Sequence, residues 1–181
     1  MKTYISLLRG INVSGQKKIQ MSGLKALYEE LEFKGVITYI QSGNVIFSTN
    51  KNASPQYLAA KIEEKINEKY GFLVPIIIRT PAEMKRILSS NPFFGKKGID
   101  AERLYVTFFL TSPKQADRKN VEKLDYAPDK YIVLDREVYL YCPQGYGKSK
   151  ISNSFFENKL KIVATTRNWK TVKTLAELAA K

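Results

Sequence analysis

The chain of 181 residues contains no histidine and only one cysteine, Cys142. The absence of histidine excludes a Ser-His-Asp triad, a Cys-His pair and every metal site that depends on an imidazole ligand. A single cysteine excludes an intrachain disulfide and leaves a structural zinc site almost without ligands. We therefore predict no metal site and no cofactor, and any acid–base chemistry would have to use Asp, Glu, Lys or Tyr.

The chain also lacks a long apolar segment. No stretch approaches the ~20 apolar residues that a membrane-spanning helix needs. The apolar run after Met1 is too short and too soon interrupted by charge for a signal peptide. We therefore expect a cytoplasmic protein without a membrane partner.

The composition is that of a folded, strongly basic protein. Hydrophobic residues make up 44% of the chain, and 30 lysines and arginines outnumber 17 acidic residues, for a net charge of +13. Such an excess favours acidic partners, namely nucleic acid, nucleotides or another anionic small molecule. The lysines are scattered, however, so the alternative is a charge that serves only solubility.

Hydrophobic periodicity and turn residues predict an α+β fold. In the first half, Ser22 is expected to cap a helix that Gly35 ends, and Ser54 to cap a helix that Gly71 ends. Strands are expected on either side of these helices, at residues 2–9, 36–40, 45–48 and 74–79. This β-α-β-β-α-β order is that of the ferredoxin-like motif.

The second half repeats the same order. After a short helix at 81–88, strands are expected at 104–110, 131–134, 138–141 and 162–165. Helices are expected at 112–124, 152–160 and 168–180. The fold class is therefore two ferredoxin-like halves packed together, with an additional C-terminal helix. The predicted boundaries are 1–80, a linking helix and loop at 81–103, and 104–181.

A glycine-rich basic loop over residues 143–150 is the first candidate site. It follows a strand and precedes a helix, where backbone amides and the lysines Lys148 and Lys150 attract anions. Gly-Lys-Ser resembles the end of a P-loop, but the glycine that pattern requires five positions earlier is Cys142. The alternative interpretation is a basic turn without a ligand. Cys142 itself is expected to be a small buried residue, because no histidine activates it.

Residues 165–169 form the second candidate. Arg167 can bind a phosphate or carboxylate through its forked guanidinium, and Trp169 can stack on a base or a ring. The alternative is that Trp169 packs the last helix on the core while Thr166 or Asn168 caps that helix.

Two polar loops in the first half are further candidates. One follows the first strand and contains Arg9 and Asn12, with Lys17 and Lys18 nearby. The other is the turn at 41–44, with Ser42 and Asn44, which suits a hairpin. Loops at strand ends are frequent ligand sites, and the alternative for the first is a tight connection in which Arg9 pairs with a local carboxylate.

Many strand residues are aromatic, which raises the possibility of base stacking on a sheet. The basic-Gly-aromatic signature of RNA-recognition domains is absent, so packing is the simpler interpretation. The rings concerned are Tyr4, Tyr39, Phe47, Tyr105, Tyr131, Tyr139 and Tyr141.

Several of these segments resemble a bacterial family known only as domain of unknown function 1697. The resemblance rests on blocks along essentially the whole chain, at residues 7–13, 39–45, 91–93, 145–150 and 165–169. Glu32 departs from the pattern, since a glycine is expected there. The resemblance implies an α+β fold with two related subdomains. It implies no activity and no catalytic residue.

The leading hypothesis is a binding module for a phosphorylated small molecule or nucleic acid. The ligand-binding residues would be Arg9, Asn12, Ser42, Asn44, Lys148, Lys150, Arg167 and Trp169. One alternative is a histidine-free enzyme of phosphoryl or group transfer, although the sequence identifies no catalytic residue. Another is a protein-interaction module, which would expose an apolar patch.

Overall fold

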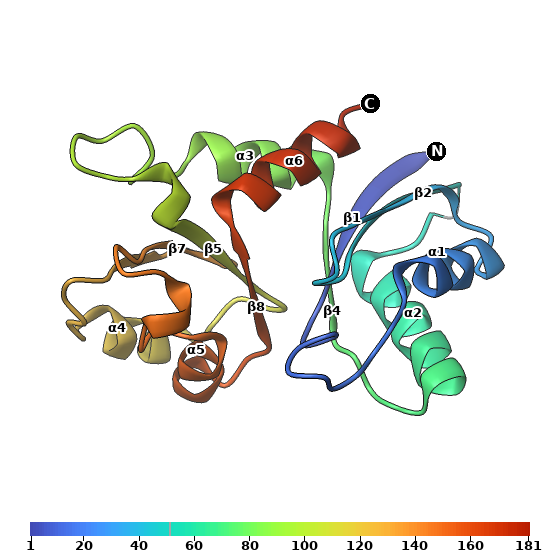
Figure 1. Ribbon diagram of the computed structural model, residues 1–181, viewed down its shortest axis with the longest axis horizontal. Coiled ribbons are helices and arrows are strands. Elements are labelled where there is room, and N and C mark those ends of the chain that lie inside the picture. The colour runs from blue at the N-terminus through green and yellow to red at the C-terminus, as the bar shows by residue number, and fades with distance from the viewer. Residues whose placement is uncertain (51) are drawn as a thin grey trace. The chain divides into compact units, whose positions relative to one another are not determined.

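The computed structural model describes residues 1–50 and 52–181, which form two compact units (Figure 1). The first unit comprises residues 1–86 with 175–181, and the second comprises residues 87–174. The chain passes between them within α3 (Pro81–Ser89) and again within α6 (Trp169–Ala179). In the described part of the chain, no helix is long and apolar enough to cross a membrane.

The first unit is a four-stranded antiparallel sheet with the strand order β2-β3-β1-β4. The helices α1 (Met21–Glu30) and α2 (Pro55–Tyr70) lie side by side on one face of it (Figure 1). The strands are β1 (Lys2–Leu8), β2 (Lys34–Tyr39), β3 (Asn44–Thr49) and β4 (Ile76–Arg79).

Alternation along the strands places one set of side chains against the helices. Tyr4 and Leu8 of β1 and Phe47 of β3 join a core with Tyr28 of α1 and Ile62 of α2. The ring of Phe47 lies 5.4 Å from that of Tyr28, edge to face. Residues two apart on a strand share a face, so this core follows directly from the strand period.

The helix-end predictions succeed for α2 and fail for α1. Ser54 Oγ accepts a hydrogen bond from Tyr57 N (3.2 Å), and Gly71 ends α2 in the left-handed conformation, as predicted. In α1 the capping position is Gln20, whose side chain makes no capping bond, and Ser22 lies inside the helix. The chain reverses at Glu32, with φ of 66°, whereas Gly35 belongs to β2.

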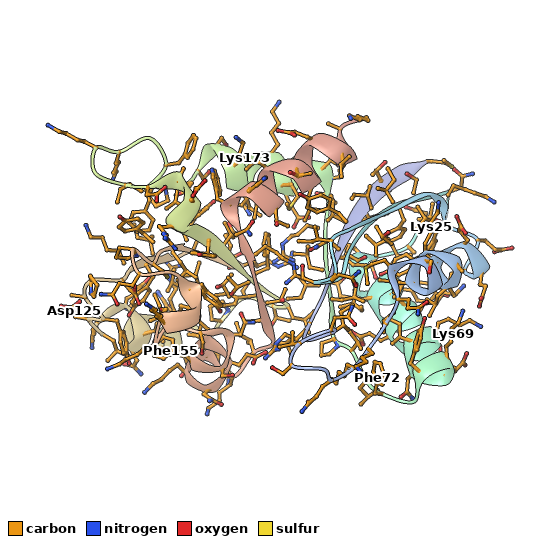
Figure 2. All side chains as sticks on the ribbon, in the orientation of Figure 1. Lys25, Lys69, Phe72, Asp125, Phe155 and Lys173 are labelled. Atoms are coloured by element: carbon orange, nitrogen blue, oxygen red, sulfur yellow. The ribbon has the colours of Figure 1, made fainter. Side chains whose placement is uncertain are left out.

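The surfaces of α1 and α2 are joined by lysine–glutamate pairs. Lys69 Nζ donates to Glu30 Oε1 (3.1 Å), and Lys65 lies 3.6 Å from the same carboxylate. The hydrogen bond from Lys69 lowers the pKa of Glu30. Lys25 and Lys69, labelled in Figure 2, lie on the surfaces of their helices. Because these pairs are exposed, each contributes little to stability.

The second unit has the same arrangement, with the strand order β6-β7-β5-β8 and antiparallel pairing throughout. The helices α4 (Gln115–Glu122) and α5 (Asn153–Leu160) pack on one face. The strands are β5 (Leu104–Phe109), β6 (Lys130–Val133), β7 (Glu137–Tyr141) and β8 (Ala164–Asn168). Phe109, Leu140 and Phe156 are fully buried in its core.

The largest differences from the prediction in the second unit are at one end of α4 and one end of β8. The helix α4 begins at Gln115, because residues up to Lys114 are still extended and Ser112 does not cap it. The last strand runs to Asn168 rather than Thr165, because it pairs with β5 along its whole length. Asn168 Oδ1 then accepts from Thr171 N (2.8 Å), so of the two capping residues considered, Asn168 caps α6.

Candidate functional site

The predicted site residues are divided equally between the two units. Arg9, Asn12, Ser42 and Asn44 lie in the first unit, and Lys148, Lys150, Arg167 and Trp169 lie in the second. Each unit therefore contains its own set of four candidate residues.

Asn12 holds its own loop in place. Its Nδ2 donates to the carbonyls of Ile19 and Gln41, both at 2.9 Å, and its Oδ1 accepts from Ile19 N at 2.9 Å. The backbone at Asn12 has φ of 56°, a conformation that asparagine tolerates better than most residues. Since both donor hydrogens of its amide are engaged, Asn12 positions the loop that follows β1 against the turn at residue 41.

Ser42 and Asn44 brace the turn between β2 and β3. Asn44 is fully buried, and its Nδ2 donates to Tyr39 O (2.9 Å) and to Ser42 Oγ (3.2 Å). A Cβ at Gly43, where φ is 76°, would lie 2.8 Å from Leu8 Cβ, so only glycine fits there. Arg9 is half-buried at the end of β1, and its backbone N donates to Pro75 O (2.9 Å).

A cavity of about 740 Å³ lies beside these loops in the first unit. Lys18, Ser22 and Tyr70 line it, and neither the Lys18 ammonium nor the two hydroxyls have a hydrogen-bond partner in residues 1–50 and 52–181. The remaining lining residues are Asn12, Ile19, Gln20, Met21, Gly23 and Gln41.

The N-terminus of α1 opens into this cavity. The first intrahelical bond recorded there runs from Leu24 N to Gln20 O (2.9 Å), and the Gln20 side chain caps none of the preceding amides. The amides of Met21, Ser22 and Gly23 are therefore available to a ligand. A Cβ at Gly23 would lie 2.8 Å from the Tyr70 hydroxyl, so the glycine allows that hydroxyl to approach the helix end.

In the second unit, Lys148 and Lys150 line a different cavity, of about 500 Å³. The amides of their loop do not form an anion cradle. Gly145 N donates to Cys142 O (2.9 Å), Lys148 N to Gly145 O (3.1 Å) and Ser149 N to Tyr146 O (3.1 Å). The loop therefore resembles a P-loop in its Gly-Lys-Ser sequence but not in its backbone structure.

Cys142 is fully buried beneath this loop, as expected. Burial raises the pKa of its thiol to about 11, so the thiolate that a nucleophile requires is scarce at neutral pH. Among the described residues, no three Cys, Asp or Glu side chains are grouped as ligands for a metal ion.

A hydroxyl network lies between the sheet and α5 in the second unit, and sequence reasoning missed it. Thr166 donates to Asn153 Oδ1, lies 2.7 Å from Thr107 Oγ1, and accepts from the Tyr146 hydroxyl (3.0 Å). These residues come from four separate parts of the chain. No spacing in the sequence could have connected them.

Arg167 and Trp169 do not line the cavity that holds Lys148 and Lys150. Arg167 is 7% exposed, and its Nη1 donates to Thr165 Oγ1 (2.8 Å) and to Thr166 O (3.0 Å). Trp169 is 4% exposed, with its ring 5.4 Å from that of Phe94. These positions favour the packing interpretation of Trp169.

The strand aromatics do not present an open stacking surface. Tyr4, Phe47 and Tyr139 are buried, and the other four strand rings are half-buried. The Tyr131 hydroxyl donates to backbone carbonyls at 2.6 and 2.8 Å, and burial raises its pKa. Packing therefore accounts for these rings.

A family model described as a protein of unknown function, DUF1697, matches residues 1–139. The chain belongs to the DUF1697 family. The match ends within β7, so the basic loop at 145–150 and the segment at 165–169 lie outside it. No curated protein matches the chain.

A solved structure extends the likeness to the second unit. It is that of the conserved bacterial protein SP0830 from Streptococcus pneumoniae, with 22% sequence identity, a TM-score of 0.76 and coverage of 98% of each chain. At this identity the likeness establishes the fold. The DUF1697 assignment itself carries no activity.

Proposed function

We propose that this DUF1697 protein binds a small phosphorylated molecule in the cavity of the first unit. The observation that carries the proposal is the convergence of unpartnered donors on one cavity. They are Lys18 Nζ, the Tyr70 hydroxyl and the amides at the start of α1.

The donor set suits a phosphate. An anion at a helix N-terminus is stabilised by the free amides and by the helix dipole, and a lysine adds a full positive charge. The lining residues include no aspartate or glutamate to repel an anion. The volume of about 740 Å³ lies within the range of ordinary ligand cavities, roughly 300–1,000 Å³.

We also propose that each unit is a ferredoxin-like fold and that the protein is cytoplasmic. The first proposal is supported by the β-α-β-β-α-β order together with the strand orders β2-β3-β1-β4 and β6-β7-β5-β8. The second is supported by the low cysteine content, a single buried and free Cys142.

The test is a thermal-shift and calorimetric titration with inorganic phosphate, a pentose 5-phosphate and nucleoside monophosphates. A ligand at 100 times its dissociation constant should stabilise the protein by about 2.7 kcal/mol. The Lys18→Ala variant should weaken binding about 10-fold or more, because it removes a charged donor. The matched control is Lys34→Ala, since Lys34 is exposed on β2 and does not line the cavity.

A second variant tests the geometry without changing the charge. Gly23→Ala places a methyl group against the Tyr70 hydroxyl while improving helix propensity. We expect it to weaken phosphate binding and to leave the thermal stability of the free protein unchanged or higher. The proposal is wrong if no phosphorylated compound binds, or if Lys34→Ala reduces binding as much as Lys18→Ala does.

The nucleic-acid alternative makes a different prediction in the same titration. Affinity for single-stranded oligonucleotides would fall steeply with salt and would respond equally to Lys18→Ala and Lys34→Ala, because backbone contacts are electrostatic. The burial of the strand aromatics makes the phosphorylated small molecule the better supported of the two ligand classes.

A further inference from the structure

The cavity of about 500 Å³ in the second unit has walls of opposite charge. One wall is the loop between α4 and β6, which contributes Asp125 and Asp129. The other is the loop between β7 and α5, which contributes Lys148 and Lys150.

Among the described residues, the aspartates of one wall form no ion pair with the lysines of the other. Asp125 Oδ1 accepts from the nearby Ala127 N (3.0 Å), and Asp129 Oδ2 accepts from Ser149 Oγ (2.7 Å). Neither lysine has a hydrogen-bond or ion-pair partner in the described part of the chain. Each carboxylate therefore keeps one oxygen, and each ammonium keeps its donors, for a molecule in the cavity.

The Ser149 hydroxyl joins the two walls and fixes their separation. It donates to Asp129 and accepts from Ile151 N (3.1 Å). This hydrogen bond between the walls favours one arrangement of the two loops before any ligand binds. Pre-organised groups bind more tightly, because little ordering remains to be done on binding.

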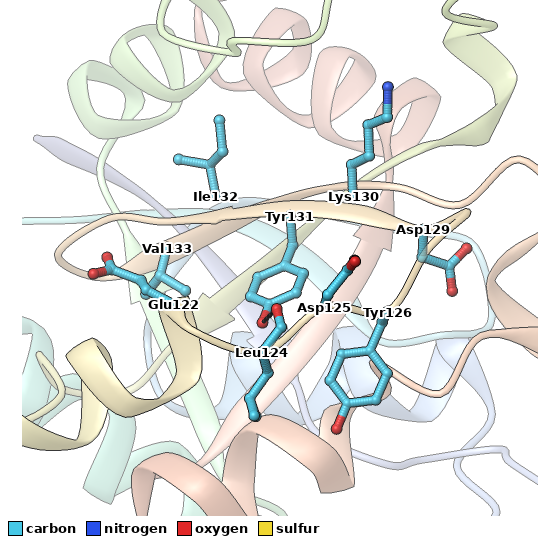
Figure 3. A pocket seen from close by; sticks show the side chains of 9 residues that line it. All are labelled: Glu122, Leu124, Asp125, Tyr126, Asp129, Lys130, Tyr131, Ile132 and Val133. Atoms are coloured by element: carbon cyan, nitrogen blue, oxygen red, sulfur yellow. Dashed lines mark hydrogen bonds between the residues drawn. The ribbon is translucent and has the colours of Figure 1, made fainter.

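Aromatic rings anchor the acidic wall. Tyr126 packs edge to face on Phe155 of α5, with ring centroids 5.1 Å apart, and the Tyr131 hydroxyl donates to Val121 O (2.6 Å). Figure 3 shows the rings of Tyr126 and Tyr131 projecting to the same side of β6, with Lys130 and Ile132 on the other side. Half-buried rings thus attach the acidic loop to the rest of the second unit.

We propose that this cavity binds a small zwitterion. Asp125 and Asp129 would receive its ammonium group, and Lys148 and Lys150 would receive its carboxylate or phosphate. A simple anion would meet two carboxylates, and a simple cation would meet two ammonium groups. Only a molecule that carries both charges is attracted by both walls. This inference concerns the second unit and is independent of the phosphate site proposed for the first.

The test compares zwitterions with fragments that carry one charge. The probes are β-alanine and O-phosphoethanolamine, set against propionate and ethylammonium, each followed by amide chemical-shift changes in the full chain. We expect at least one zwitterion to bind about 10-fold or more tightly than either fragment, with shifts at residues 125–129 and 144–150. The preference between β-alanine and O-phosphoethanolamine identifies the acidic group.

Variants on each wall separate this site from general surface charge. Asp125→Asn keeps the oxygen that caps Ala127 N, and Lys148→Met keeps the length of the side chain, so both should fold normally. Each should weaken the zwitterion about 10-fold. The matched controls Asp135→Asn and Lys119→Met, both at exposed positions, should leave binding unchanged.

The proposal is overturned if propionate or ethylammonium binds as tightly as the zwitterions, or if no probe binds at all. It is equally overturned if the control variants lose as much affinity as the wall variants. Failure of phosphate binding in the first unit would not affect it, because Lys18 and Tyr70 do not line this cavity.

Discussion

In the first unit, Ser6 of the central strand β1 faces the helices α1 and α2. In the second unit, Thr107 of the central strand β5 faces the helices α4 and α5. The two positions correspond, since Ser6 pairs with Val45 of β3 and Thr107 pairs with Val138 of β7. Each is a fully buried hydroxyl on the helix-covered face of its sheet. A shared topology thus tolerates a polar residue at the centre of the core, provided that a partner is supplied.

The partners differ in number. Ser6 Oγ accepts from the Tyr28 hydroxyl (2.7 Å) and donates to Val45 O (3.2 Å), so Tyr28 depends on a single side chain. Thr107 contacts Thr166, which also has Asn153 and Tyr146 as partners. The Tyr28 hydroxyl thus has one side-chain partner, whereas Thr107 belongs to a network of side chains, which predicts different sensitivity to mutation.

The cavities show the same contrast between the units. The first gathers donors around a helix end and has no acidic residue in its lining. The second places aspartates opposite lysines. Two units with one strand order therefore suit different ligand chemistry, because the loops, and not the sheet, supply the charged groups.

The largest expected effects come from emptying either core. Phe47→Ala in the first unit and Phe156→Ala in the second should each cost about 3–5 kcal/mol, because both rings are fully buried against other rings. Native-state hydrogen exchange should show the loss of protection concentrated in β1 and β3 for the first variant and in β5 and β7 for the second.

This measurement tests whether the units are separate in energy as well as in topology. Each has its own apolar core, which is the reason to expect separate effects. An equal loss of protection in both sheets of either variant would show that the two units unfold as one.

An intermediate effect should distinguish the two buried hydroxyls. Ser6→Ala should cost about 1–3 kcal/mol, because it leaves the buried Tyr28 hydroxyl without its partner. Burial raises the pKa of that hydroxyl, so it cannot escape the cost by ionising. Thr107→Val should cost less than about 1 kcal/mol, since Thr166 keeps two partners. Urea unfolding of both variants gives the comparison.

A double variant provides the control for this contrast. Adding Tyr28→Phe to Ser6→Ala removes the unsatisfied hydroxyl, and should recover much of the lost stability. If Thr107→Val lowers the free energy of unfolding as much as Ser6→Ala does, the other partners in the network do not compensate for the lost bond. The proposed contrast between the units would then be wrong.

The order of elements could be predicted, because it depends on local signals. A strand is recognised from the alternation of a few consecutive residues, and the start of α2 from the neighbouring pair Ser54-Pro55. The predicted start of α1 was wrong. Ser22 is a good capping residue by type, but the chain is already helical at that position. Capping depends on backbone conformation, which residue type favours but does not determine.

The candidate sites were less predictable, because their decisive contacts are distant in sequence. Asn12 was identified as polar and near a loop, but its amide proves to be engaged by Ile19 and Gln41. Tyr70 reaches Gly23 only in the folded chain, and nothing in the spacing pairs them. The polar loops could be found from the sequence, whereas the groups left open to a ligand could not.

The smallest expected effect concerns two helix ends with strained backbone. Glu32 follows α1 with φ of 66°, and Lys161 ends α5 with φ of 57°, whereas α2 ends at a glycine. Glycine adopts this conformation without steric cost. Glu32→Gly and Lys161→Gly should each stabilise the protein by up to about 1 kcal/mol, after allowing for the greater entropy of glycine in the unfolded chain.

The two substitutions should not gain equally. The C-terminus of a helix favours a positive charge, so Lys161 stabilises α5 and its removal offsets part of the relief of strain. Glu32 places a negative charge at the same end of α1, so the helix dipole adds to the gain from Glu32→Gly and does not offset it. Glu32→Gln separates the effect of the charge from the effect of the backbone strain, because it removes the charge and keeps the strained backbone. In urea unfolding we expect stability to rise in the order Lys161→Gly, then Glu32→Gly, and the reverse order would show that the helix dipole does not govern these two ends.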